Sequence, residues 1–148
     1  MGIIFKNGDM FTSNAKVLVN TINCVGAMGK GIALIHKQKY PEQYDEYRKK
    51  CFAKQIHTGN VYYWKGTDYG YEKDVLQFPT KFHWRNPSEL SYIRSGLQAF
   101  VDKYEEFGIT YIAFPKLGCS NGGLKWEVVK PIMLEYLRNL PIEIEIWE

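Results

Sequence analysis

Hydrophobic residues recur along the chain in short runs that alternate with longer segments of helical spacing. The short runs, rich in β-branched and aromatic residues, predict strands at 3–7, 15–23, 60–66, 73–79, 109–115 and 142–147. Apolar residues three and four positions apart predict helices at 32–40, 41–52, 88–108 and 125–139. This alternation predicts an α/β fold in which helices cover both faces of a central mixed sheet of about six strands.

Several residues sharpen this pattern. Three consecutive apolar residues, Val17 to Val19, predict a strand buried on both faces, whereas the alternation in 142–147 predicts a strand with one face in water. Ser88 can cap the helix that follows it, and Gly108 can end that helix. Pro131 is expected to kink the last helix or to mark its true start.

Composition narrows the class of protein. The 148 residues have room for one ordinary domain, which we expect to span 1–148. A hydrophobic share of 45% excludes intrinsic disorder, and no apolar run approaches the roughly 20 residues of a membrane span. The first residues lack the features of a signal peptide, and the three cysteines form no CxxC, which argues against a disulfide framework. We therefore expect a cytoplasmic monomer.

Two glycine-rich segments each follow a predicted buried strand and precede a predicted helix. The first, CVGAMGKG (24–31), follows Asn20 and Asn23, whose amides can bind sugar hydroxyls. The second is LGCSNGG (117–123). Each could be a plain turn, but two such loops at one edge of a sheet predict a cleft whose backbone amides bind phosphate. The three histidines lack metal-ligand spacing, so we expect neither a metal nor another cofactor.

A third segment, FPTKFHWR (78–85), places a lysine just past a strand end among aromatic residues. Partial desolvation there would lower the pKa of Lys81 and favour a nucleophilic amine, although a solvated surface lysine is the plainer interpretation. His83 could act as an acid or base, and Trp84 and Arg85 could contact nucleic acid, which a net charge of +3 permits. Cys24 and Cys119 lie in the two loops, but no local sequence pairs either with a base, so we expect them to be packing residues.

Four motifs, in this order, resemble the macrodomain family: Gly8-Asp9 after the first strand, VNTINCVGAMGKGIAL (19–34), FPTKFHWR (78–85) and PKLGCSNGGLKW (115–126). Within it, they resemble the antitoxin macrodomains of the DarG type, which remove ADP-ribose from thymidine in DNA. The resemblance covers nearly the whole chain and implies a three-layer α/β/α fold, no metal, and hydrolysis of the bond at the anomeric carbon of ADP-ribose. Such antitoxins usually carry a further C-terminal domain, whereas these 148 residues end after the last motif, so two alternatives stay open: a stand-alone protein or a piece of a longer one.

The resemblance also implies a role for each matching residue. Asp9 would accept a hydrogen bond from the adenine amino group, and Lys81 would be catalytic. The other implied ADP-ribose contacts are Met10 beside the adenine; Thr21, Ile22 and Asn23 at the distal ribose; the amides of Ile32, Ala33 and Leu34 at the diphosphate; Thr80 at the distal end; and Gly118, Cys119, Ser120, Asn121 and Gly122 over the phosphates.

One position separates branches of the family. Related hydrolases that act on ADP-ribosylated glutamate have an aspartate in the second loop, where this chain has Gly122, as DarG-type members do. The sequence therefore favours ADP-ribosylated single-stranded DNA as substrate and a mechanism without an acidic partner for Lys81. Three alternatives stay open: a reader that binds ADP-ribose without turnover, a hydrolase of ADP-ribosylated protein side chains, and a phosphatase or deacetylase of ADP-ribose derivatives.

Overall fold

Six strands and four α-helices make up the structure, a computed structural model that describes residues 2–148. The strands are β1 (Gly2–Lys6), β2 (Val17–Ile22), β3 (Tyr62–Trp64), β4 (Asp74–Pro79), β5 (Tyr111–Phe114) and β6 (Glu143–Trp147). The helices are α1 (Gly31–Lys39), α2 (Pro41–Phe52), α3 (Leu90–Lys103) and α4 (Trp126–Leu137), with two short 3-10 helices, Met10–Thr12 and Gly66–Tyr69, that the pattern did not predict. Every predicted strand and helix is present.

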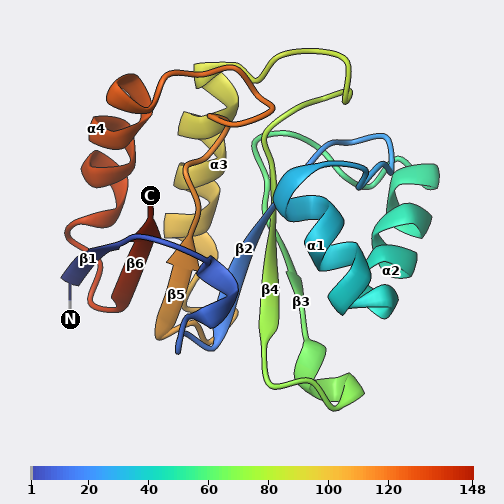
Figure 1. Cartoon of the computed structure of the whole chain (residues 1–148), viewed down its shortest axis with the longest axis horizontal. Helices are drawn as coiled ribbons and strands as arrows, with labels where there is room; N and C mark the ends of the chain where they lie inside the picture. The colour runs from blue at the N-terminus through green and yellow to red at the C-terminus, as the bar shows by residue number, and fades with distance from the viewer. Residues whose placement is uncertain (1) are drawn as a thin grey trace.

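The strands form one mixed sheet in the order β1-β6-β5-β2-β4-β3, as Figure 1 shows. Only β3 runs antiparallel to its neighbour among these six strands. The other five are parallel, so their carboxyl ends lie along the same edge of the sheet. The chain after β2 and the chain after β5 leave neighbouring strands in opposite directions across the sheet, which is where ligands bind in open α/β sheets.

Helices cover both faces of the sheet, so the predicted three-layer α/β/α fold is confirmed. Val17 and Val19 face the core beneath α3 and α4, whereas Leu18 faces α1 through a separate cluster with Ile32. This alternation on β2 explains why three consecutive residues are hydrophobic, because both faces of the strand are buried.

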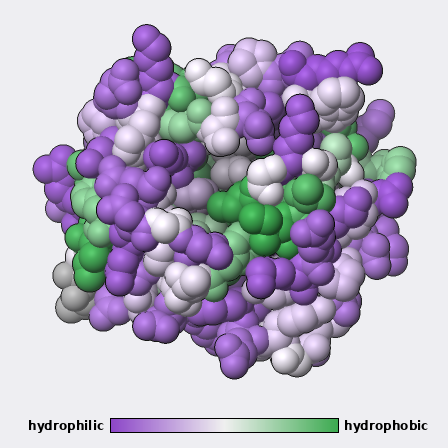
Figure 2. All heavy atoms as spheres, in the orientation of Figure 1, coloured by the Kyte–Doolittle hydropathy of each residue, from purple (hydrophilic) through white to green (hydrophobic). Residues whose placement is uncertain are grey.

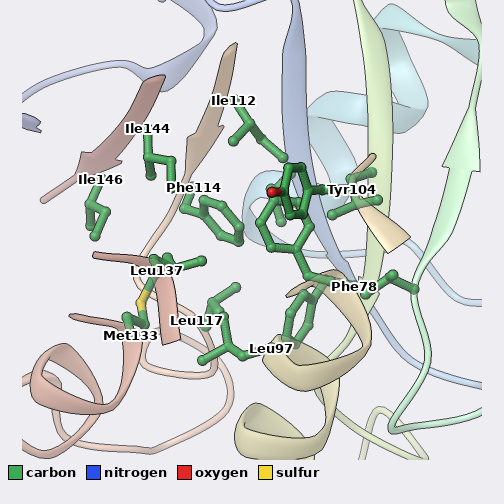
Figure 3. Close-up of a cluster of buried hydrophobic side chains, with 14 of the residues drawn as sticks. Phe78, Leu97, Tyr104, Ile112, Phe114, Leu117, Met133, Leu137, Ile144 and Ile146 are labelled. Carbon is green, nitrogen blue, oxygen red and sulfur yellow. The ribbon is translucent and has the colours of Figure 1, made fainter. Parts of the chain in front are cut away.

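The larger core lies between the sheet and the helices α3 and α4, and Figure 3 shows its side chains converging from all of them. Phe100 and Phe114 meet edge to face with their ring centroids 5.3 Å apart. Phe78 lies against Gly96 of α3, where a Cβ would come within 2.4 Å of the phenyl ring. Fully burying an aromatic or aliphatic side chain of this size contributes about 1.5–3 kcal/mol each, so this core holds α3 and β4 in close contact.

Three predictions of helix ends need correction. Glu89, not Ser88, is the residue that precedes the first turn of α3, and no side chain caps that helix. α3 ends at Lys103, five residues before Gly108. α4 begins at Trp126 and continues through Pro131, so this proline does not mark its start. Each error arises because a single residue signals only roughly where a helix begins or ends, whereas the surrounding packing decides which turn is the last.

The expectation of one wet face for β6 is wrong at Glu145, which is buried. Its carboxylate accepts hydrogen bonds from Ser13 Oγ, Tyr111 Oη and Trp147 Nε1. Burial opposes ionisation, but these hydrogen bonds outweigh it and hold the pKa of Glu145 below its ordinary value. This carboxylate thereby fastens the segment after β1 to the end of the sheet.

Candidate active site

A cleft of about 1060 Å³ opens along the carboxyl ends of the parallel strands. Segments that follow β1, β2, β4 and β5 line it, together with the end of β6. Figure 2 shows a hollow on the visible face, with hydrophobic side chains gathered beside it where α1 lies in Figure 1. Ile32 and Ile35 of α1 line the cleft on that side. The prediction that both glycine-rich loops meet at one edge of the sheet is therefore confirmed.

The amino end of α1 presents backbone amides to the cleft. No side chain caps this helix, and the amides of Gly31, Ile32 and Ala33 donate to no other atom of residues 2–148. The amide of Leu34 instead donates to Lys30 O at 3.2 Å, and Leu34 does not line the cleft. The expectation that Leu34 supplies an amide is wrong, because the fourth residue of a helix already makes the first intrahelical hydrogen bond. The third free amide at this end of α1 is that of Gly31 instead.

The second loop is shaped by close contacts of its own glycines. Gly118 has φ +70°, and its carbonyl accepts from Leu124 N at 3.0 Å. A Cβ at Gly122 would lie 2.3 Å from Gly118 O and 2.4 Å from Ser88 Oγ, so only glycine fits there. The amide of Cys119 donates a hydrogen bond within the loop, to Lys116 O at 3.3 Å. The amides of Gly118, Ser120, Asn121 and Gly122 donate to no atom that the structure describes, which leaves four of the five predicted amides free for an anion.

The two loops approach each other over the cleft. A Cβ built on Gly31 would lie 3.0 Å from Asn121 Nδ2, and Gly31 has φ +56°. The free amides of α1 and those of the second loop therefore line opposite sides of one narrow passage. Oriented backbone amides of this kind form a site for an anion such as a diphosphate.

Asn23 lines the cleft as predicted, but its side chain also shapes the first loop. Its Oδ1 accepts from Val25 N, Ala27 N and Tyr47 Oη, and its Nδ2 donates to Ala27 O at 2.9 Å. Asn20 is fully buried inside the sheet and bonded to Gln77, so it does not reach the cleft. Of the two asparagines predicted to bind sugar, only Asn23 is in place, and it has one amide hydrogen left to offer.

Lys81 lies in the cleft wall just past β4. The pairing of β2 with β4 continues beyond the strands, since Thr80 N donates to Ile22 O and Cys24 N donates to Phe82 O, both at 2.9 Å. These hydrogen bonds fix the backbone on either side of Lys81. Its Nζ lies 3.3 Å from Trp84 O, and partial burial, with nearby Lys30, holds the pKa of Lys81 below its ordinary value. The geometry thus favours a partly desolvated amine over a freely solvated one.

The two cysteines and His83 are less suited to catalysis than Lys81. Burial raises the pKa of the Cys24 and Cys119 thiols, so neither is a ready thiolate at neutral pH. The Cys24 thiol instead donates to Lys81 O at 3.6 Å. His83 does not line the cleft, and its Nδ1 accepts from Arg85 N at 3.1 Å. In residues 2–148 no group of three His, Cys, Asp or Glu side chains could hold a metal ion, and none of the helices is long and apolar enough to cross a membrane.

Asp9 and Met10 lie at the opposite end of the cleft from Lys81. Asp9 Oδ1 accepts from Phe11 N at 3.0 Å and so caps the short helix Met10–Thr12. The Met10 side chain is buried in a cluster to which Phe11 and Trp147 add their partly exposed rings. An exposed carboxylate beside these rings suits a flat heteroaromatic group that has a hydrogen-bond donor.

Some residues that line this end were not predicted. Phe11 and Trp147 come from opposite ends of the chain and pack against the same cluster because β1 pairs with β6. No local motif in the sequence marks either residue. Lys30 and Gly31, by contrast, stand inside the first glycine-rich motif, and counting from the start of the helix would have identified the Gly31 amide.

The order of strands spreads the predicted contacts along the cleft. Asp9 follows β1, the two glycine-rich loops follow β5 and β2 near the middle, and Lys81 follows β4. Four strand spacings separate β1 from β4, about 19 Å at the usual spacing of about 4.8 Å. The cleft is therefore long and narrow, with an aromatic pocket at one end, amides in the middle and an amine at the other.

Comparison with known proteins decides the family. The model of the macro domain matches residues 19–133. The chain belongs to the macro domain family. The matched range runs from β2 to α4 and so contains both glycine-rich loops and Lys81.

Several relatives of this macro domain have names or solved structures. The DNA ADP-ribosyl glycohydrolase of Mycobacterium tuberculosis is 40% identical over 94% of this chain, which covers 40% of that protein. The structure of the macrodomain of Mycobacterium tuberculosis DarG matches with a TM-score of 0.92 and 39% identity, covering 98% of this chain and 96% of that one. Thermosipho africanus DarTG in complex with ADP-ribose matches with a TM-score of 0.88 and 37% identity over 95% of this chain and 39% of that one. The chain thus spans about 40% of the length of the relatives named DNA ADP-ribosyl glycohydrolase.

Proposed function

We propose that this macro domain binds ADP-ribose along its cleft and hydrolyses the bond between the anomeric carbon of ADP-ribose and a base in DNA. The observation that carries the proposal is the order of groups in the cleft: the Asp9 pocket, then the free amides of two loops, then Lys81. Adenine, diphosphate and distal ribose follow one another in the same order along ADP-ribose. The relatives named DNA ADP-ribosyl glycohydrolase support DNA as the acceptor.

In this proposal most of the binding energy comes from groups other than Lys81. Asp9 accepts from the adenine amino group beside Met10, and the amides of Ile32 and Ala33, with that of Gly31, bind the diphosphate. The remaining contacts, as predicted from the sequence, are Thr21, Ile22 and Asn23 at the distal ribose, Thr80 beyond it, and the loop from Gly118 to Gly122 over the phosphates. The substrate is single-stranded DNA, and the macro domain acts as a monomer.

Lys81 acts at the anomeric carbon. A neutral amine can add there, expel the base and open the sugar to an imine, which water then hydrolyses. A charged amine can only protonate the departing base or stabilise its charge. The lowered pKa of Lys81 increases the neutral fraction and so supports the covalent route. The close contacts around Gly122 leave no room for an aspartate at that position. This supports a mechanism in which Lys81 acts without an acidic partner.

The deciding experiment compares substrates and two Lys81 variants. Purified protein is incubated with ADP-ribosylated single-stranded DNA and, separately, with ADP-ribosylated protein, and released ADP-ribose is measured. We expect release from DNA, with Lys81→Ala losing it while its ADP-ribose affinity stays within a few-fold of the wild type. Lys125→Ala is the matched control, because Lys125 is exposed and lies outside the cleft.

The outcomes of this experiment distinguish the possible roles of Lys81 and the possible functions of the macro domain. Lys81→Arg keeps the charge but cannot deprotonate, so it should be inactive if the imine forms and partly active if Lys81 is an acid. Borohydride should trap an ADP-ribosyl adduct that mass mapping places at Lys81. Full turnover by Lys81→Ala would remove this residue from the mechanism. Release from protein alone would make the macro domain a protein hydrolase, and no turnover of either substrate would make it a reader of ADP-ribose.

A further inference from the structure

Beyond Lys81, the surface carries aromatic side chains that face solvent. Phe82 is 58% exposed and Trp84 is 50% exposed. The Arg85 guanidinium lies 4.9 Å from the centroid of the Trp84 ring. Trp84 and Arg85 line the mouth of the cleft, whereas Phe82 lies outside it. An exposed ring under a cation offers both a stacking face and a charge to a molecule that leaves the cleft here.

This surface continues onto the first glycine-rich loop. The hydrogen bond from Cys24 N to Phe82 O places Phe82 beside Val25, which is 43% exposed. The next residue, Gly26, lies against α2, since a Cβ there would be 3.6 Å from Cys51 Cβ. Figure 1 shows the loop after β4, the loop after β2 and the end of α2 at the same edge of the molecule. Exposed apolar side chains therefore lie along this edge between the cleft mouth and α2.

The end of α2 carries a second cation and ring. Phe52 is 77% exposed, more than any other large hydrophobic side chain in residues 2–148. The Arg48 guanidinium lies 5.7 Å from the centroid of the Phe52 ring and 5.5 Å from that of Tyr44. Two groups in which a cation lies over an exposed ring thus flank the Phe82–Val25 surface.

Acidic groups on α2 are drawn away from this surface. Two of its three carboxylates are engaged with aromatic side chains of the segment from β3 to β4: Glu46 accepts from Trp64 Nε1 at 2.7 Å, and Glu42 accepts from Tyr71 Oη at 2.6 Å. The basic side chains of the helix, by contrast, take part in no salt bridge with any described residue. The surface therefore attracts anions.

We propose that this surface, the strand path (Lys81, Phe82, Trp84, Arg85, Val25, Arg48 and Phe52), binds the single-stranded DNA that flanks the modified base. The inference rests on the proposed function and adds where the strand runs. Cations placed between solvent-facing rings suit a backbone of phosphates whose unpaired bases can stack. A duplex keeps its bases stacked on one another and offers no base face to Phe52 or Phe82, so the path selects a single strand.

The test uses the far end of the strand path, away from the cleft. Arg48→Glu and Phe52→Ala are compared with Arg138→Glu, which makes the same charge change at an exposed residue after α4, near the opposite edge of the sheet. Affinity for an unmodified oligonucleotide of about 12 nucleotides is measured at several salt concentrations. KM and kcat are measured on an ADP-ribosylated oligonucleotide and on ADP-ribosylated thymidine, and ADP-ribose affinity checks folding.

We expect Arg48→Glu to weaken oligonucleotide binding and to raise the oligonucleotide KM by about tenfold, with kcat unchanged. Its salt dependence should become shallower by about 0.7 for the one lost phosphate contact. Phe52→Ala should weaken binding about fivefold or more without changing that slope, because stacking releases no counterions. Neither variant should alter KM on ADP-ribosylated thymidine.

Other outcomes overturn the strand path. Oligonucleotide affinities equal to that of Arg138→Glu would do so, as would equally tight binding of an acidic peptide or of duplex DNA of the same length. Failure of the proposed function looks different. In that case the wild type releases no ADP-ribose from the oligonucleotide or from thymidine, while the binding measurements still report on the strand path.

Discussion

Gly122→Ala should damage both the second loop and ADP-ribose binding, although it adds a single methyl group. The new Cβ would start 2.3 Å from Gly118 O and 2.4 Å from Ser88 Oγ. The first of these atoms belongs to the backbone of the same loop and the second to a buried side chain, so neither can swing aside. Restoring an ordinary contact requires a shift of about 1 Å, and overpacking of this kind costs about 1–3 kcal/mol.

The same shift moves the amides that are proposed to bind the diphosphate. Losing one hydrogen bond to a charged group costs about 1.5–3 kcal/mol, which corresponds to a ten- to hundredfold rise in Kd for ADP-ribose. Calorimetry measures that Kd, and thermal unfolding measures the accompanying loss of stability. The added methyl group would not meet the ligand itself, because the Cβ at Gly122 would point into the loop.

Gly29→Ala is the matched control. Gly29 also lines the cleft and lies in a glycine-rich loop, but it has no positive φ, and a Cβ there would meet no atom within 4 Å. We expect that variant to keep the wild-type Tm and to bind ADP-ribose within about twofold. If Gly122→Ala binds ADP-ribose as tightly as Gly29→Ala does, the second loop does not bind the ligand through its amides.

Three further predictions concern single side chains. Asp9→Asn keeps an oxygen to cap Met10–Thr12 but loses the acceptor for adenine, so ADP-ribose affinity should fall by about 1–3 kcal/mol with little change in Tm; unchanged affinity in calorimetry would remove Asp9 from the site. Burial, with a smaller effect of Lys39, lowers the pKa of His36 to about 3, so its stabilising effect is complete above the unfolded pKa of about 6.5 and is lost as pH falls toward 3. Urea unfolding should show His36→Leu losing about 2 kcal/mol less stability than the wild type between pH 7 and pH 5, and parallel pH profiles would contradict this. Glu145→Gln should lose about 1–3 kcal/mol at pH 7, and because the pKa of Glu145 is lowered, the difference from the wild type should shrink as pH falls below about 4; a difference that persists at pH 3 would mean that the charge is unimportant.

Local pattern predicted the elements of this fold well because most of its strands are buried on one or both faces. β2 and β5 are short hydrophobic runs bounded by polar or glycine-rich segments, and such runs in alternation with helices leave few topologies open. The pattern failed where a residue's partner is distant in sequence. Glu145 alternates like an exposed residue, but Ser13 and Tyr111, both distant in sequence, contact its carboxylate in the buried position.

In the candidate site, too, some features could be predicted from local sequence and others depend on distant residues. Both glycine-rich loops and Lys81 could be found from the sequence because each follows a buried strand, and parallel strands end at one edge. Which atoms are free could not be found so easily. Asn23 has the right chemistry for a sugar, but most of its hydrogen-bonding capacity goes to its own loop and to Tyr47. Hydrogen-bond availability depends on the full set of neighbours, which a motif does not contain.

The pairing of β1 with β6 has a consequence for how the protein acquires its activity during synthesis. Gly2 pairs with Glu143, so the first strand of this sheet to be synthesised must wait for β6 before it can pair. Contacts between such distant positions form slowly, and on the ribosome they cannot form until β6 has emerged from the exit tunnel. Asp9 and Trp147, at one end of the cleft, are brought together only by this step. A nascent chain can therefore assemble the loops around Lys81 first, and the adenine end of the cleft is completed last.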